Sequence, residues 1–154
     1  MVVPSPEYFV VKPTAGGLPA GLPAEAAGST GLFVVQNAAH AADPREEWDK
    51  LMREYGEDLE FAVPVMVDEQ GRQSLPTGKI VVQFRDPPSG EALQQFEDSY
   101  GLRYLKTNEF RQEQLSFEAR DQKAAYQPDL IARLGGDQNI KLAAPETVSQ
   151  YQRV

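Results

Sequence analysis

The chain has no cysteine and only one histidine, His40. The lack of cysteine excludes disulfides, thiolate metal ligands and cysteine nucleophiles. A serine or threonine nucleophile needs a neighbouring base, and His40 stands in a polar loop, "NAAHAAD", without an orienting partner. Metal ligands normally come as clusters at fixed spacing, and the sequence offers neither cysteine nor paired histidine. We therefore expect no catalytic residues and no metal site.

Phosphate-binding motifs are missing as well. The stretch "TAGGLPAGLPAEAAG" is rich in glycine, but it lacks the Lys-Ser/Thr ending of a P-loop and does not begin a convincing helix. Adjacent carboxylates occur at positions 46–47, 68–69 and 97–98. Neighbours on a helix point in different directions, so such pairs are typical of a solvated face rather than of acid–base chemistry. The prediction is a protein that is not an enzyme and needs no cofactor.

Long apolar runs and an excess of basic residues are also absent. No run approaches the roughly 18 apolar residues that a membrane span requires. The opening "MVVPSPEYFVVKP" has no basic region and no long apolar region of a secretion signal. The 15 Lys and Arg residues against 23 Asp and Glu give a net charge of −8, which opposes binding to a phosphate backbone. We expect no nucleic acid or membrane partner, and a cytosolic protein or one domain of a longer chain.

Residues 1–74 are predicted to form a smaller α/β lobe. Its strands are expected at Tyr8–Lys12, Leu32–Gln36 and Leu59–Val67. A helix should begin at Asp43 and Pro44, an N-cap followed by proline at the first helical position. Four large residues then recur at helical spacing and predict one buried face: Trp48, Leu51, Met52 and Tyr55.

Two further features concern the end of this lobe. Gly56 is placed to end the helix, and Pro64 indicates that its strand is an edge strand or carries a bulge. The stretch "DEQGRQSLPTG" has the composition of a turn. The boundary between the two lobes is therefore predicted within it.

Residues 75–145 are predicted to form a second lobe. A strand at Lys79–Arg85 leads to a helix with Ser89 as its N-cap and Gly101 after its end. "LRYLK" and "EQLSFEA" should form a hairpin, followed by a helix from about Ala124 to Leu134 and a strand over "NIKLAA". The order strand, helix, strand, strand, helix, strand is that of the ferredoxin-like fold, so the predicted class is α+β. Residues 146–154 are left as a C-terminal tail.

Both lobes contain a strand, a helix and a strand, and similar short motifs occur at the same places in the two units. The letters "VVQ" recur with an offset of 47 residues and "YG" with an offset of 45. Two explanations stay open, an internal duplication and the convergence of two short amphipathic units.

The second lobe resembles a known family. "LPTGKIVVQFRDPPSGEALQQFEDSYGLRYLK", then a hairpin, then "LIARLGGDQNIKLAAPETVSQYQR" is similar to the N-terminal prodomain of subtilisin-like serine proteases, especially the fervidolysin type. The resemblance covers about half of the chain, from Leu75 to Arg153. The sequence departs from the family in three respects: it includes no signal peptide, it includes no catalytic domain, and its N-terminal half is longer than in short prodomains. We therefore expect either a free-standing inhibitor or a fragment of a longer precursor.

The resemblance implies a binding function. Prodomains of this family dock their sheet on two helices of the protease, assist its folding and inhibit it, in cis or in trans. It implies that the tail residues Gln150, Tyr151, Gln152, Arg153 and Val154 enter the active-site cleft. It also makes Glu109 and Glu113, near the middle hairpin, the candidates for capping the N-termini of the protease helices. The alternative is a general interaction or regulatory module with a ferredoxin-like core and no protease partner.

Overall fold

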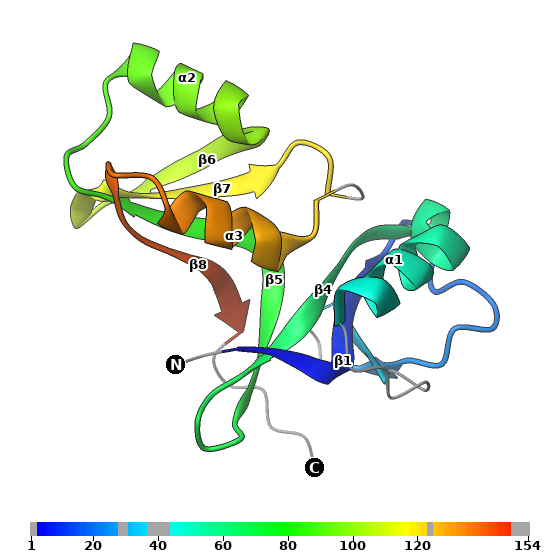
Figure 1. Ribbon diagram of the computed structural model, residues 1–154. Helices are drawn as coiled ribbons and strands as arrows, with labels where there is room; N and C mark the ends of the chain where they lie inside the picture. Colours follow the sequence, from blue (N-terminus) through cyan, green and yellow to red (C-terminus); the bar gives the residue numbers. More distant parts are fainter. Residues whose placement is uncertain (1–2, 28–30, 37–43, 123–124, 149–154) are drawn as a thin grey trace. The chain divides into compact units, whose positions relative to one another are not determined.

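The computed structural model describes residues 3–27, 31–36, 44–122 and 125–148 (Figure 1). The protein belongs to the α+β class, as predicted. In chain order its elements are β1 (Val3–Pro13), β2 (Glu25–Ala26), β3 (Phe33–Gln36), α1 (Pro44–Tyr55), a 3-10 turn (Gly56–Asp58), β4 (Leu59–Val67), β5 (Gln73–Phe84), α2 (Gly90–Tyr100), β6 (Leu102–Asn108), β7 (Arg111–Ala119), α3 (Gln127–Gly135) and β8 (Ile140–Val148). None of the helices in the described ranges is long and apolar enough to cross a membrane.

The chain divides into two compact units. Unit 1 contains the described residues up to Thr77 together with Thr147 and Val148, and unit 2 runs from Gly78 to Glu146. Strands β5 and β8 each contribute residues to both units. The two units are described separately below.

Unit 1 has strands in the order β2, β3, β1, β4, followed by the first part of β5. Strands β3 and β4 lie on either side of β1 and are antiparallel to it, so Val34 and Val63 both stand opposite Val10. The sequence unit β3, α1, β4 therefore has another strand inserted between its two strands. Val10 belongs to a buried cluster with Val34, Phe61 and Val65 on one face of this sheet.

Helix α1 packs on the unit 1 sheet through the predicted apolar stripe. Trp48 and Leu51 are buried, while Met52 and Tyr55 are half-buried. The indole Nε1 of Trp48 donates a hydrogen bond to the carbonyl of Ala62 on β4, at 2.7 Å. The helix begins at Pro44, and the predicted N-cap Asp43 lies outside the described residues.

The predicted turn between the lobes is wrong over most of its length. The chain reverses only at Asp68–Arg72, where the Asp68 carboxylate accepts hydrogen bonds from the backbone N–H groups of Gln70 and Arg72 at 2.9 Å. Residues 73–78 belong to β5, although they include Pro76 and Gly78. Burial outweighs local turn propensity here, because Leu75 is completely buried and residues Ser74 and Gln73 pair with β4. Gly78, with φ of 88°, supplies the backbone conformation that lets one strand pass from unit 1 into unit 2.

Pro64 was expected on an edge strand or at a bulge. Strand β4 lies between β1 and β5, but β5 pairs with it only at Met66 and Val67, so Pro64 lies beyond the part of β4 that pairs with β5. The register between β1 and β4 shifts between Pro4 and Phe9, and Phe9 stands opposite Pro64. The extra residues of this irregularity belong to β1, so Pro64 stands beside an irregular pairing rather than within a bulge of its own strand.

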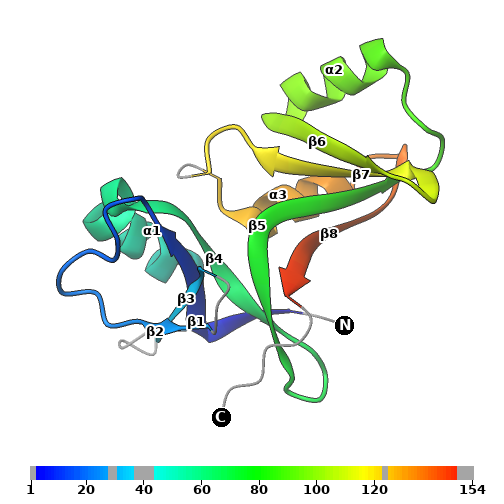
Figure 2. The same ribbon diagram turned by 180° about the vertical axis from the view of Figure 1, so that it is seen from behind.

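Unit 2 has strands in the order β8, β5, β7, β6, and both of its helices cover one face of that sheet (Figures 1 and 2). The predicted N-cap is confirmed, because the Ser89 hydroxyl accepts a hydrogen bond from the Ala92 N–H at 3.2 Å. Gly101 ends α2 in the left-handed conformation, with φ of 64°. The shared core contains Ile80, Val82, Phe84, Phe96, Leu102, Leu115, Phe117, Ala119, Leu130, Leu134 and Ile140.

Two boundaries in unit 2 differ from the prediction. Helix α3 begins at Gln127 rather than near Ala124, which places Pro128 in the first turn, where its missing N–H costs no helical hydrogen bond. Strand β8 continues past Ala144 to Val148, with Pro145 inside it. Proline is tolerated because β8 ends the strand order of unit 2. Residues 146–148 are thus strand rather than tail, and Val148 packs against the buried cluster of unit 1.

Two truncations test the helix packing. Trp48→Ala and Phe96→Ala should each lower the free energy of unfolding by about 3 to 5 kcal/mol, because each removes a large buried side chain from between a helix and a sheet. Urea denaturation of both variants measures this, with the exposed positions Lys50→Ala and Gln94→Ala as controls on the same helices. A loss below ~1 kcal/mol for both core variants would contradict the packing described here.

Candidate docking surface

The open face of the unit 2 sheet is the face turned away from α2 and α3 (Figure 2). Side chains alternate along β5 and β7, so that Ile80, Val82, Leu115 and Phe117 point to the helices. The residues between them point to the open face, and the register sets Val81 opposite Ser116 and Gln83 opposite Gln114. Within unit 2, no described helix covers these uncharged side chains.

The described residues of unit 1 form no equivalent open face near the centre of its sheet. Phe9 and Val10 are adjacent in β1 and therefore point to opposite faces of the sheet, yet both are buried. Helix α1 covers the face of Phe9, and the cluster around Val10 fills the other. A partner that needs an accessible sheet face therefore finds one in unit 2.

Charged residues border one end of the open face. Lys79 and Arg103 both stand opposite Glu118, which lies on the strand between them. Arg103 forms an ion pair with Glu118 across the β6–β7 pair. The ion pair neutralises both charges, so this end of the open face is polar and lies beside the uncharged side chains of the centre.

A groove of about 520 Å³ lies at the other end of the open face, next to the β6–β7 hairpin. Val81 and Ser116 contribute from the sheet centre, and Glu146 from β8. The hairpin contributes Lys106 and Phe110. The groove therefore joins residues of all four strands of unit 2, with an aromatic ring and charges of both signs around it.

Phe110 is the most exposed large apolar side chain in the described part of the chain, at 91% of its accessible area. Its backbone N–H donates a hydrogen bond to the Asn108 Oδ1 at 2.8 Å, which fixes the turn. Sequence reasoning missed both Phe110 and Glu146. An aromatic residue in a predicted hairpin turn is the signal that would have found Phe110, since turns favour Gly, Asn, Asp and Ser.

The structure brings one of the site residues predicted from the sequence to the groove, and the others lie elsewhere or outside the described residues. Glu109 is exposed at the hairpin tip and lines the groove. Glu113 is half-buried on β7 and does not line it. Gln150, Tyr151, Gln152, Arg153 and Val154 lie outside the described residues, as does His40.

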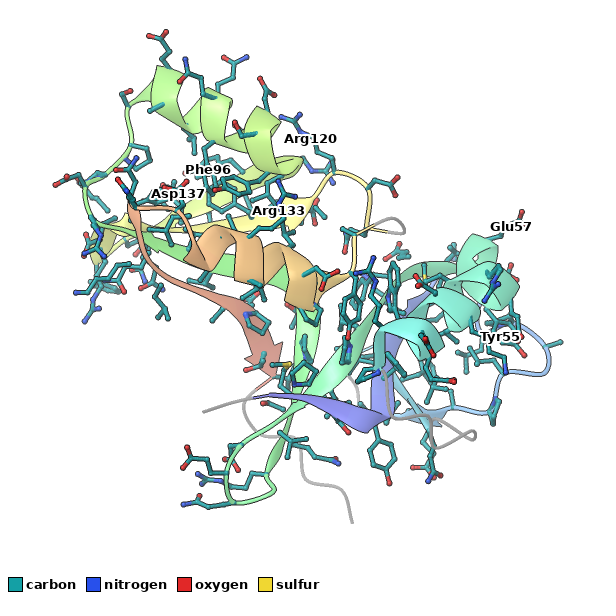
Figure 3. The ribbon with its side chains drawn as sticks, viewed as in Figure 1. Tyr55, Glu57, Phe96, Arg120, Arg133 and Asp137 are labelled. Carbon is teal, nitrogen blue, oxygen red and sulfur yellow. The ribbon has the colours of Figure 1, made fainter. Side chains whose placement is uncertain are left out.

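A second and larger groove, of about 760 Å³, lies between α2 and α3 on the covered face. The Tyr100 hydroxyl donates a hydrogen bond to the Asp137 Oδ2 at 2.9 Å, and the guanidinium of Arg133 stands 5.3 Å from the Tyr100 ring centroid. Figure 3 shows Phe96, Arg133 and Asp137 in this region. These contacts join the two helices, which gives the residues a structural role in the core of unit 2.

The grouping and the pKa values of the titratable side chains among the described residues bear on metal binding and acid–base chemistry. No group of three or more His, Asp or Glu side chains among them is placed to hold a metal ion. Hydrogen bonds from the backbone N–H of Arg72, from its side chain and from Gln70 lower the pKa of Asp68, and all of them serve the turn after β4. Burial, followed by the hydrogen bond to Asp137, raises the pKa of Tyr100.

Comparisons of the chain with protein-family models, with curated proteins and with solved structures found no match. Function must therefore be argued from the residues and the geometry of unit 2.

The raised pKa of Tyr100 predicts a pH effect on stability. The folded protein holds the hydroxyl proton to a higher pH than the unfolded chain, so this contribution is complete below about pH 10 and is lost as the pH rises through the raised pKa. Between about pH 9 and about pH 11, wild type should lose more unfolding free energy than Tyr100→Phe, as measured by urea denaturation. Equal losses in both proteins would contradict the assignment.

Proposed function

We propose that unit 2 is a ferredoxin-like domain. Its elements follow the order β5, α2, β6, β7, α3, β8, which is the split β-α-β arrangement repeated twice. The strand order β8, β5, β7, β6 supports this proposal. Strand β7 lies between β5 and β6, and β5 lies between β7 and β8, so each strand–helix–strand unit encloses one strand of the other. Both helices then lie on one face by construction, which leaves the other face for a partner.

The proposed function is that of a prodomain: the protein inhibits a subtilisin-like serine protease and assists its folding. The observation that carries the proposal is the open face of unit 2, with Val81, Gln83, Gln114 and Ser116 at its centre. Uncharged side chains cost less to desolvate than charged ones, and the amides of Gln83 and Gln114 can form hydrogen bonds to the partner. The resemblance of residues 75–153 to subtilase prodomains names the partner.

In the proposed complex, acidic groups of the hairpin face the N-termini of the protease helices. A helix N-terminus carries unpaired N–H groups and a partial positive charge, so a carboxylate beside it is stabilising. Glu109 has the better position for this role, because it is exposed and lines the groove next to the open face. Glu113 is the weaker candidate, because alternation along β7 places it on the same face as Leu115, which points to the helices.

The segment after β8 supplies the inhibitory element. An extended peptide binds a protease cleft mainly by backbone hydrogen bonds, and Gln150–Val154 contains neither proline nor glycine. We propose that these residues occupy the substrate cleft, with the Tyr151 side chain in a subsite.

Truncation tests the inhibitory segment. The full chain should inhibit hydrolysis of a peptide substrate by subtilisin, and deletion of residues 150–154 should raise the inhibition constant by about 100-fold or more, because cleft hydrogen bonds and subsite burial are lost. The unfolding midpoint of the truncated protein is measured in parallel. If truncation leaves inhibition unchanged, the segment is not the inhibitory element. If the full chain inhibits no subtilase and does not bind one, the general interaction module replaces the prodomain.

Charge reversal tests the capping residues. Glu109→Lys should weaken binding to the protease, because a positive charge next to a helix N-terminus is repelled, and adding Glu113→Lys should weaken it by less, because Glu113 lies on the helix face of β7. The loss should be larger at about 0.01 M than at about 1 M salt, since salt screens the interaction. Glu91→Lys is the matched control on α2, on the helix side of unit 2. Unchanged affinity of the double variant at low salt would remove both residues from the interface.

A further inference from the structure

The fold itself does not explain the phenyl ring of Phe110. Residues Glu109 and Phe110 form the turn between β6 and β7, and Asn108 stands opposite Arg111. The turn is held by the hydrogen bond from the Phe110 N–H to the Asn108 side chain, which any residue at position 110 except proline can form. The ring is 91% exposed, so it contributes almost nothing to the core.

The Phe110 ring lies beside the groove of the open face, where it can contact a docked partner. Phe110 lines the groove at the hairpin end of the open face together with Val81 and Ser116. Lys106, Glu109 and Glu146 surround the same groove. An apolar group with a polar rim is the composition of the energetically important part of a protein interface, where a few large residues carry most of the affinity.

We propose that Phe110 is the apolar anchor of the docking surface and inserts into an apolar pocket on the protease catalytic domain, beside the helix N-terminus that Glu109 approaches. The inference rests on the proposed function and adds the residue that sets affinity and partner choice. The hydrogen bond at Asn108 holds the backbone of residue 110 before binding, so less backbone freedom is lost in the complex. The two adjacent residues thus present an apolar contact and a negative charge from one turn.

Replacement of the ring tests the anchor. Phe110→Ala should raise the inhibition constant against subtilisin at least tenfold, and Phe110→Leu should give a smaller increase, because it retains part of the apolar contact. The unfolding midpoint should not change in either variant, since the ring is exposed. Leu142→Ala is the matched control: Leu142 is the other exposed large apolar residue of the described chain, at 58%, and it does not line the groove.

A double-mutant cycle tests the role of Asn108. Asn108→Ala should weaken inhibition less than Phe110→Ala does, because it loosens the turn but keeps the ring. In the Phe110→Ala background, Asn108→Ala should have almost no further effect, since there is no ring left to orient. Fully additive effects would show that Asn108 acts independently of Phe110.

The outcomes separate the anchor from the proposed function. If wild type inhibits subtilisin and Phe110→Ala inhibits equally well, the anchor is wrong while the prodomain function stands. If Leu142→Ala weakens inhibition as much as Phe110→Ala, the affinity does not depend on one anchor, and the inference is again overturned. Failure of the wild-type protein to bind and inhibit overturns the proposed function and the anchor with it.

Discussion

The aromatic cluster between α2 and the sheet of unit 2 is the contact on which the rest of that unit depends. The Phe96 ring lies 5.0 Å from the rings of both Phe84 and Phe117, measured between centroids. These three side chains join one helix to the two central strands, and α3 packs against the same core. Because strand side chains alternate between the two faces, burying this set toward the helices presents the intervening residues on the opposite face. The open face is thus a direct consequence of where the core is placed.

The two units apply one arrangement in two different ways. In each, a strand–helix–strand segment leaves room for a third strand between its two strands: β1 enters between β3 and β4, and β7 between β5 and β6. Unit 1 buries both faces of the resulting sheet, with Phe9 and Val10 inside on opposite sides. Unit 2 buries one. A sheet with two buried faces offers neither face to a partner, whereas a sheet with one polar face can bind a partner without exposing a large apolar patch to solvent.

In the proposed interface the centre is uncharged, and most of the binding free energy comes from a few residues at one end. Affinity in protein complexes follows the quality of a few anchors rather than the area buried. The centre of the open face, around Val81 and Ser116, provides complementarity, whereas the hairpin presents Phe110 and Glu109. The net charge of −8 suits a partner that presents positive potential, such as the N-termini of helices. The ion pair of Arg103 with Glu118 keeps charges at the far end of the face paired.

The sequence by itself determined the class of the fold, the order of the elements apart from the short strand β2, and the buried faces of α1 and α2. Helical spacing at Trp48 and Phe96 and the caps at Ser89 and Gly101 are local signals. The sequence placed the lobe boundary in a turn, since Pro76 and Gly78 are turn residues, and only the tertiary structure shows one strand continuing through them, because long-range pairing and the burial of Leu75 outweigh local propensity. It ended β8 at Ala144, because Pro145 reads as a strand breaker unless the strand is known to lie at an edge. The surface around Phe110 was likewise decided by tertiary structure: its groove joins β5, the hairpin and β8, which are distant in sequence and meet only through strand pairing.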